Sequence, residues 1–176
     1  LFSLLITGIG SLVVLYSIGY LSKSEQLGNF YCYLLLFMGA MLGVVFSDNF
    51  IILYLFWELT SFSSFLLISF WREKKASIYG AQKSLIITVL GGLSLLGGII
   101  LLSLVADTFS IHSMINKASE IQSSPFFILA MVFFMISAFT KSAQVPFYIW
   151  LPDAMEAPTL LVLIFTQLRW LKLAFI

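Results

Sequence analysis

Charged side chains are scarce in this chain: nine basic and eight acidic residues stand among 176, and 61% of the residues are hydrophobic. A soluble domain carries about 25% charged residues, because its surface must be wetted. With 10% charged residues and a mean hydropathy of +1.07, this chain has too little polar surface to cover itself in water. The scarcity of charge therefore excludes an ordinary soluble domain and indicates a membrane protein.

Other absences narrow the classes of function. The single cysteine, Cys32, lies in an apolar run, which leaves no disulfide framework and no thiolate metal site. The sequence has no Gly-rich phosphate loop, no metal-ligand cluster and no Ser-His-Asp arrangement, so we expect no cofactor. The net charge of +1 gives no sign of nucleic-acid binding, and no nucleic-acid partner is expected. The lone histidine, His112, falls in a polar stretch and is expected to be solvated. The chain begins within an apolar stretch without a basic region, so we expect a piece of a longer protein rather than a signal peptide.

Apolar stretches of about 20 residues, long enough to cross a bilayer as helices, dominate the sequence. Short polar breaks separate them, and the longest polar stretch, 107–124, is expected to form a short interfacial helix. The pattern predicts an all-α polytopic membrane protein with about five or six transmembrane helices. The expected spans are 1–21, 28–47, 50–70, 78–106, 125–146 and 160–176.

Basic residues in short loops predict the orientation of the spans. Segment 71–77 contains three basic residues, which places it in the cytoplasm. Alternation then places Lys23 inside, and Asp48 and segment 107–124 outside. The first span would start outside, which is unusual for a native first helix and again indicates sequence upstream.

Glu58 is the most informative charge, because it lies near the middle of the span 50–70, with eight residues before it and twelve after it. A charge at that depth costs roughly 2.5–3.5 kcal/mol on insertion scales. Such a residue is tolerated if it is protonated, paired or faces a wet cavity. A structural alternative is a carboxyl group hydrogen-bonded between helices by Thr60, Ser61 or Ser63.

Lys141 is the expected partner of Glu58. It follows sixteen uncharged residues, and Pro146 comes five residues later. Proline removes a backbone donor and clashes one turn back, so it breaks the helix, and broken helices in membranes line wet or protein-packed sites. The alternative is that the span ends at Thr140 and that Lys141 extends to the interface. Nearby polar side chains favour a polar cavity: Gln144, Asp153 and Glu156.

Lys83 is the third candidate, five residues inside the span 78–106. Its structural alternative is an interfacial lysine that extends to the membrane surface. Its functional interpretation is a positive charge within reach of Glu58 that modulates the carboxyl group. The same span carries Gly91-Gly92 and Gly97-Gly98, and these small residues are expected to let neighbouring helices approach closely.

A buried lysine loses its proton more readily when it is desolvated and holds it more tightly beside a carboxylate. A Glu–Lys pair that opens and closes is therefore a proton switch. Our hypothesis is that Glu58 and Lys141 form such a switch.

Three stretches carry a resemblance to a known family. Residues 53–71 read LYLFWELTSFSSFLLISFW, residues 138–159 read AFTKSAQVPFYIWLPDAMEAPT, and residues 20–49 read YLSKSEQLGNFYCYLLLFMGAMLGVVFSDN. They closely resemble the antiporter-like membrane subunits, a family shared by respiratory NADH dehydrogenase (complex I) and multisubunit Mrp-type sodium/proton antiporters. Within this family, the amino-acid sequence of these stretches is most similar to that of the large A subunits of the antiporters.

The resemblance covers residues 1–159 and implies an antiporter-like bundle of inverted repeats with broken helices, of which this chain holds about one five-helix repeat. It implies that Glu58 and Lys141 are the proton-transfer pair, with Lys83 as a further proton-transfer residue. It also implies a secondary transporter subunit, not an enzyme, in the bacterial plasma membrane, which exchanges protons for sodium beside partner subunits and binds lipid. The alternative is a proton-pumping subunit of NADH:quinone oxidoreductase that binds no NADH itself, since the chain has no dinucleotide site.

Residues 160–176 depart from the family, whose members continue after Ala-Pro-Thr with a sequence like Pro-Val-Ser-Ala-Tyr-x-His-Ser-Ala-Thr-Met-Val-Lys-Ala-Gly. One DNA string encodes Leu160 to Phe175 in one frame and Pro-Val-Ser-Ala-Tyr-Phe-His-Ser-Ala-Thr-Met-Val-Lys-Ala-Gly-Ile in the adjacent frame. Our hypothesis is that 160–176 is a frameshifted apolar tail. A non-functional truncated product is therefore a further alternative.

Overall fold

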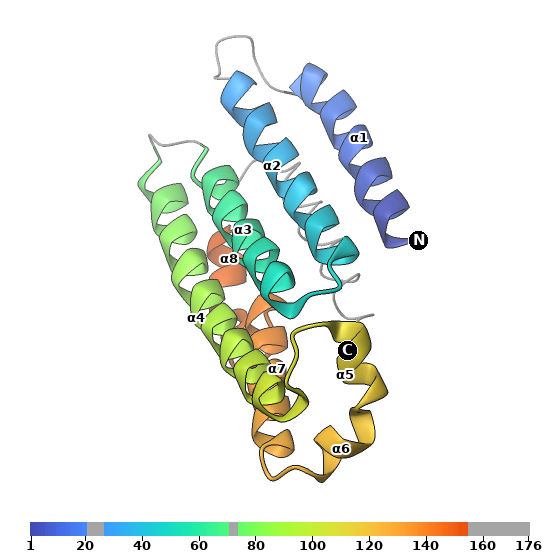
Figure 1. Cartoon of the computed structure of the whole chain (residues 1–176). Helices are drawn as coiled ribbons and strands as arrows, with labels where there is room; N and C mark the ends of the chain where they lie inside the picture. Colours follow the sequence, from blue (N-terminus) through green and yellow to red (C-terminus); the bar gives the residue numbers. More distant parts are fainter. Residues whose placement is uncertain (21–26, 71–73, 155–176) are drawn as a thin grey trace.

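The computed structural model describes residues 1–20, 27–70 and 74–154, and the fold of these ranges is helical. Four long helices lie side by side, and each runs in the opposite direction to the one before it in the chain (Figure 1). At a rise of 1.5 Å per residue, a helix of 19 residues is about 29 Å long, which matches the hydrocarbon core of a bilayer. All four are long and apolar enough to cross a membrane. They are α1 (Phe2–Tyr20), α2 (Leu27–Phe46), α3 (Phe50–Ile68) and α4 (Lys75–Ala106).

The outward faces of the long helices are apolar. Leu12 and Leu15 in α1, Leu55 in α3 and Leu104 in α4 are all exposed. Soluble proteins keep such exposed apolar patches small, because water contact with them is unfavourable. These faces therefore suit contact with lipid.

Helix α4 is the centre of the bundle. It packs against α3 on one side and against α7 (Phe127–Lys141) on another, and α8 (Leu151–Ala154) lies against it as well. A Cβ atom at Gly98 would lie 2.9 Å from the Phe134 ring and 3.2 Å from the Ala130 carbonyl oxygen. Glycine is needed at this position because any side chain would push α7 away. The packing role expected of this glycine is confirmed.

The turn between α2 and α3 is tied to the segment after α4. The Asn49 side chain caps α3 by accepting a hydrogen bond from the Ile51 backbone N–H at 2.9 Å. The Asp48 carboxylate accepts hydrogen bonds from the Ser110 hydroxyl at 3.1 Å and from the His112 backbone N–H at 3.2 Å. The 107–124 stretch then forms two short helices, α5 (Ile111–Asn116) and α6 (Ala118–Ser123).

Helix α7 stops at Lys141, five residues before Pro146. The chain turns through Ala143, whose φ of 52° lies in the left-handed region, and continues as the 3₁₀ helix η1 (Phe147–Trp150) and α8. The carbonyl oxygen of Thr140 has lost its helical partner and accepts a hydrogen bond from the buried Trp150 indole N–H at 3.0 Å. The residues after the break therefore support the end of α7.

The predicted spans 1–21, 28–47, 50–70 and 78–106 match α1 to α4 within a few residues. The predicted span 125–146 is wrong at its end, because α7 stops at Lys141. Proline lacks the N–H group that would bond to the Ser142 carbonyl oxygen, and its ring clashes with that carbonyl group one turn back. It also disfavours the helical conformation in the residue before it, so the helix ends before the proline. The predicted span 160–176 lies outside the described residues.

Candidate functional site

The middle of α3 presents polar side chains to the interior of the bundle. Thr60, Ser61 and Ser63 are buried there. The Thr60 hydroxyl donates to the Trp57 carbonyl oxygen at 2.7 Å, and the Ser63 hydroxyl donates to the Leu59 carbonyl oxygen at 2.8 Å. Both hydroxyls donate to backbone carbonyl oxygens of their own helix. The structural alternative, in which Thr60 or Ser63 donates to the Glu58 carboxyl group, is therefore not what the structure shows.

The Glu58 side chain lies between α3 and α4, against the backbone of Gly92. A methyl group on Gly92 would overlap Glu58 Oε1. This oxygen is buried, and it has no hydrogen-bond partner among the residues that the structure describes. A buried polar atom without a hydrogen-bond partner is costly, so its presence calls for an explanation such as a functional role.

Lys141 is buried at the end of α7, with 8% of its surface exposed. Its ammonium group donates to the Ser61 hydroxyl oxygen and, at 3.3 Å, to the Trp57 carbonyl oxygen. It also lies 5.4 Å from the centre of the Trp57 ring, within the range of a cation–π interaction. Of the two sequence-based interpretations, extension to the interface does not describe this lysine, because its side chain points into the bundle.

The structure brings Lys141 and Glu58 to the same part of α3. The ammonium group contacts the residue before Glu58 and the residue one turn after it, and its charge acts on the Glu58 carboxyl group. Among the described residues, however, no ion pair at contact distance joins the two side chains. The arrangement places a proton-binding carboxyl group and a cation near each other in an apolar interior, where their charges interact strongly.

Lys83 has a different partner. Its ammonium group forms an ion pair with Asp153 Oδ2 at 2.6 Å, and the side chains are 28% and 36% exposed. The Asp153 carbonyl oxygen also lies against Gly80, one turn before Lys83 on α4. The pair therefore links α4 to the segment after the break. At this exposure, solvent screens the two charges, so the pair contributes little to stability.

The glycines of α4 mark the site as well. A methyl group on Gly91 would overlap the Thr140 hydroxyl, just as one on Gly92 would overlap Glu58. Sequence reasoning assigned this pair of glycines to packing and missed that their neighbours are Glu58 and the residue before Lys141. It also missed that Ser61 contacts Lys141. The spacing Glu58–Ser61, three residues apart on one helix, is the signal that was present.

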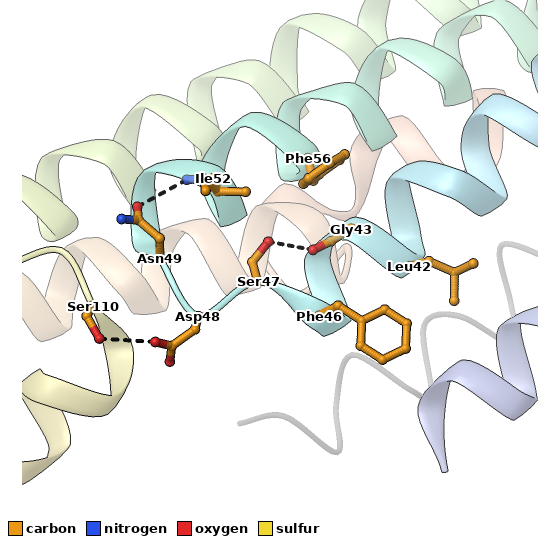
Figure 2. A pocket seen from close by; sticks show the side chains of 9 residues that line it. All are labelled: Leu42, Gly43, Phe46, Ser47, Asp48, Asn49, Ile52, Phe56 and Ser110. Atoms are coloured by element: carbon orange, nitrogen blue, oxygen red, sulfur yellow. Dashed lines mark hydrogen bonds between the residues drawn. The ribbon is translucent and has the colours of Figure 1, made fainter.

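A separate cavity of about 540 Å³ opens at the α2–α3 turn (Figure 2). Phe56 and Asp48 line it, together with Ser110. Phe56 is two residues before Glu58, and two residues turn a helix by about 200°, so the two side chains point to opposite sides of α3. The cavity therefore does not belong to the site around Lys141. His112 is exposed near this end, as expected.

The described residues contain no group of three or more His, Cys, Asp or Glu side chains placed to hold a metal ion. Glu156, one of the polar side chains near the break, lies outside the described residues.

The fold and the buried charges define a multi-pass helical membrane protein with ionisable groups in its interior. The chain belongs to the family described as "NADH:quinone oxidoreductase/Mrp antiporter, TM", whose model matches residues 47–176. A second family model, "NADH-Ubiquinone oxidoreductase (complex I), chain 5 N-terminus", matches residues 1–31. The family resemblance noted in the sequence is thereby confirmed, and the protein is a multi-pass protein of the cell membrane.

The chain is similar to proteins named Na(+)/H(+) antiporter subunit A1. It is 92% identical over 149 residues to that of Staphylococcus epidermidis strain RP62A and 87% identical over 159 residues to that of Staphylococcus haemolyticus strain JCSC1435. These alignments cover 85% and 90% of this chain but 19% and 20% of the relatives. The chain thus spans about a fifth of the length of the curated relatives it matches.

The chain is also similar in structure to subunits of two solved membrane complexes. The Mrp complex from Dietzia sp. DQ12-45-1b matches with a TM-score of 0.84 and 35% identity, over 92% of this chain and 18% of that one. The membrane-bound sulfane sulfur reductase, an archaeal respiratory complex, matches with a TM-score of 0.75 and 17% identity, over 93% of this chain and 34% of that one. The second match supports the fold alone.

Proposed function

We propose that this chain is part of a proton-translocating subunit of a multisubunit sodium/proton antiporter. The observation that carries the proposal is the buried ammonium group of Lys141, which lies at a broken helix and contacts α3 on both sides of Glu58 in sequence. The high sequence identity of the chain to antiporter A1 subunits supports sodium/proton antiport over NADH-driven proton pumping. In this role the protein is a secondary transporter subunit that works beside other subunits in the bilayer.

Glu58 and Lys141 transfer the proton in this proposal. When the ammonium group is close to Glu58, it stabilises the carboxylate; when it moves away, the carboxyl group in its apolar surroundings takes up a proton. Alternation between these two arrangements moves a proton past the middle of α3. The break after Lys141 supplies the freedom for this movement, because residues beyond α7 are not held in a continuous helix.

Besides Lys141 on α7, Lys83 on α4 takes part as the second positively charged residue of the proton path. Its ion pair with Asp153 connects it to the segment that follows the break. A movement of the segment after Lys141 shifts Asp153 and so alters its ion pair with Lys83. Lys83 then exchanges its proton with water at the partly exposed end of the site.

The test is sodium-driven proton movement in membrane vesicles that contain the full-length subunit with its partner subunits and an imposed pH gradient. Added sodium is expected to dissipate the gradient without NADH. The alternative within the family, a proton-pumping subunit of NADH:quinone oxidoreductase, predicts proton movement only when NADH is oxidised. The absence of proton movement under both conditions would contradict both roles.

We also propose that the antiporter-like domain is 1–159 and that 160–176 is a frameshifted tail. The alignments with the two staphylococcal relatives extend over 149 and 159 residues, while the family model extends to residue 176. In the gene, one added base after the codon for Thr159 is expected to restore Pro-Val-Ser-Ala and an open frame with further apolar stretches. Reading the nucleotide sequence across this point tests the idea. If neither shifted frame continues the family pattern, the tail is genuine.

A further inference from the structure

Ser61 is the side chain that contacts the Lys141 ammonium group most closely among the described residues. It is buried, with 3% of its surface exposed, and lies on α3. Its oxygen accepts the hydrogen bond from Lys141, and its own proton points toward the Trp57 carbonyl oxygen at 3.4 Å. The Trp57 carbonyl oxygen is itself the second acceptor for Lys141. One turn of α3 therefore supplies a pair of oxygens for the ammonium group.

Ser61 differs from the other buried hydroxyls of this turn. The Thr60 and Ser63 hydroxyls form short hydrogen bonds to carbonyl oxygens of α3, at 2.7 and 2.8 Å, and among the described residues neither hydroxyl is hydrogen-bonded to Glu58 or Lys141. Ser61 follows Glu58 by three residues, so the two lie next to each other on the helix surface. The ammonium group at Ser61 is thus one short step from the carboxyl group.

We propose that Ser61, with the Trp57 carbonyl oxygen, holds Lys141 in a second position apart from Glu58. Ser61 is then a positioning residue, and this proposal rests on the proton-transfer role given above to Glu58 and Lys141. While Lys141 is bound at Ser61, Glu58 takes up one proton from water at one end of the proton path and becomes neutral. When Lys141 moves to Glu58, the carboxyl group releases that proton to water at the other end of the path, and the ion pair forms. The hydroxyl determines how long the lysine remains away from the carboxylate.

The number and chemistry of the acceptors support this assignment. A hydrogen bond from a charged donor is stronger than one between neutral groups, and removal of one buried partner leaves the charge to find another acceptor. The nearest charged acceptor on α3 is Glu58. Loss of the Ser61 hydroxyl is therefore expected to shift Lys141 toward Glu58, which keeps the carboxyl group ionised.

The test is the rate at which dicyclohexylcarbodiimide labels Glu58 in the assembled full-length complex, followed by mass spectrometry of the α3 peptide. This apolar reagent reacts with protonated carboxyl groups, so labelling reports neutral Glu58. The Ser61→Ala variant is expected to be labelled about tenfold more slowly, the factor that corresponds to about 1.4 kcal/mol of lost hydrogen bonding. The Ser61→Thr variant keeps the hydroxyl and is expected to be labelled at the wild-type rate.

Two more variants complete the design. Ser63→Ala removes a buried hydroxyl that does not contact Lys141 and is expected to leave labelling unchanged. Ser61→Cys is similar in size to serine but accepts hydrogen bonds weakly, so it is expected to slow labelling even if the alanine variant fails to assemble. Unchanged labelling in both Ser61→Ala and Ser61→Cys would overturn the proposal, as would equal slowing by Ser63→Ala.

The labelling result is independent of ion movement. If Ser61→Ala slows labelling but the wild-type complex moves no protons with sodium, the position of Lys141 is supported and the antiport function is wrong. If the complex moves protons but Ser61 variants are labelled like the wild type, antiport is retained and the role of Ser61 is wrong.

Discussion

Replacement of Glu58 by glutamine is expected to abolish sodium-dependent proton movement by the full-length subunit in its complex. Glutamine keeps the shape of the side chain against Gly92 but carries no titratable group. Acid–base groups contribute factors of about 10² to 10⁴ to proton-transfer rates, so we expect a loss of at least about 100-fold. The measurement is dissipation of an imposed pH gradient on addition of sodium. The amount of inserted subunit, measured in the same vesicles, is expected to equal that of the wild type.

The matched control is Glu120→Gln. Glu120 is exposed in α6, away from the apolar interior, and the same chemical change there is expected to leave transport unchanged. Wild-type transport by Glu58→Gln would contradict a role of this carboxyl group in proton transfer. Equal losses in both variants would show that the loss does not come from the site.

Replacement of Gly92 by alanine is expected to reduce transport at least about tenfold without loss of the fold. The added methyl group would overlap Glu58 Oε1, so the carboxyl group must move. Misplacement of a reacting group by about 1 Å costs roughly 100-fold in some enzymes, which makes tenfold a conservative value. The helix itself is not weakened, because alanine favours a helix over glycine by about 1 kcal/mol. The pH-gradient assay and the thermal stability of the purified complex measure the two effects separately.

Gly97→Ala on the same helix is the control for this substitution. A Cβ atom at Gly97 would lie 3.7 Å from the Phe133 ring, an ordinary van der Waals contact. We therefore expect wild-type transport and unchanged or slightly raised stability. The account is wrong about the placement of Glu58 if Gly92→Ala and Gly97→Ala transport equally well.

Most of the fold follows from the distribution of apolar residues. Spans of about 20 apolar residues bounded by short polar breaks can satisfy their backbone groups in a membrane only as helices, which is why α1 to α4 were predicted to within a few residues. The end of α7 was not, because the effect of Pro146 reaches five residues back through the left-handed Ala143. Local hydrophobicity contains no information about how far such a break extends.

The residues of the candidate site were predicted in part, and their role in proton transfer stays a prediction. The depth of Glu58 in a continuous apolar span marked it as a candidate functional residue, since a charge at that depth is energetically costly. For Lys141, spacing left burial and interfacial extension open, because both fit a lysine at the end of a span. Its burial depends on Ser61 from α3, eighty positions earlier, and on the close approach of α4 and α7 at Gly98.

Lys83 illustrates the same limit. Its partner, Asp153, is seventy positions away and belongs to a segment whose path is set by the break after α7. A sequence with one apolar stretch after another gives no register between helices, so it did not indicate Asp153 as the partner of Lys83. The glycines of α4 help to set that register, because their small size lets Glu58, Thr140 and Asp153 lie directly against this helix.

A double-mutant cycle with Glu58→Asp and Lys141→Arg tests the central claim most directly. Each conservative change keeps the charge but alters its position, so each single variant is expected to retain a measurable, reduced rate of sodium-driven proton movement. If Glu58 and Lys141 act as a unit, the double variant is expected to transport at a rate that differs from the product of the two single losses by at least about fivefold, equivalent to about 1 kcal/mol of coupling. Losses that simply multiply would show that the two residues act independently and would contradict the account.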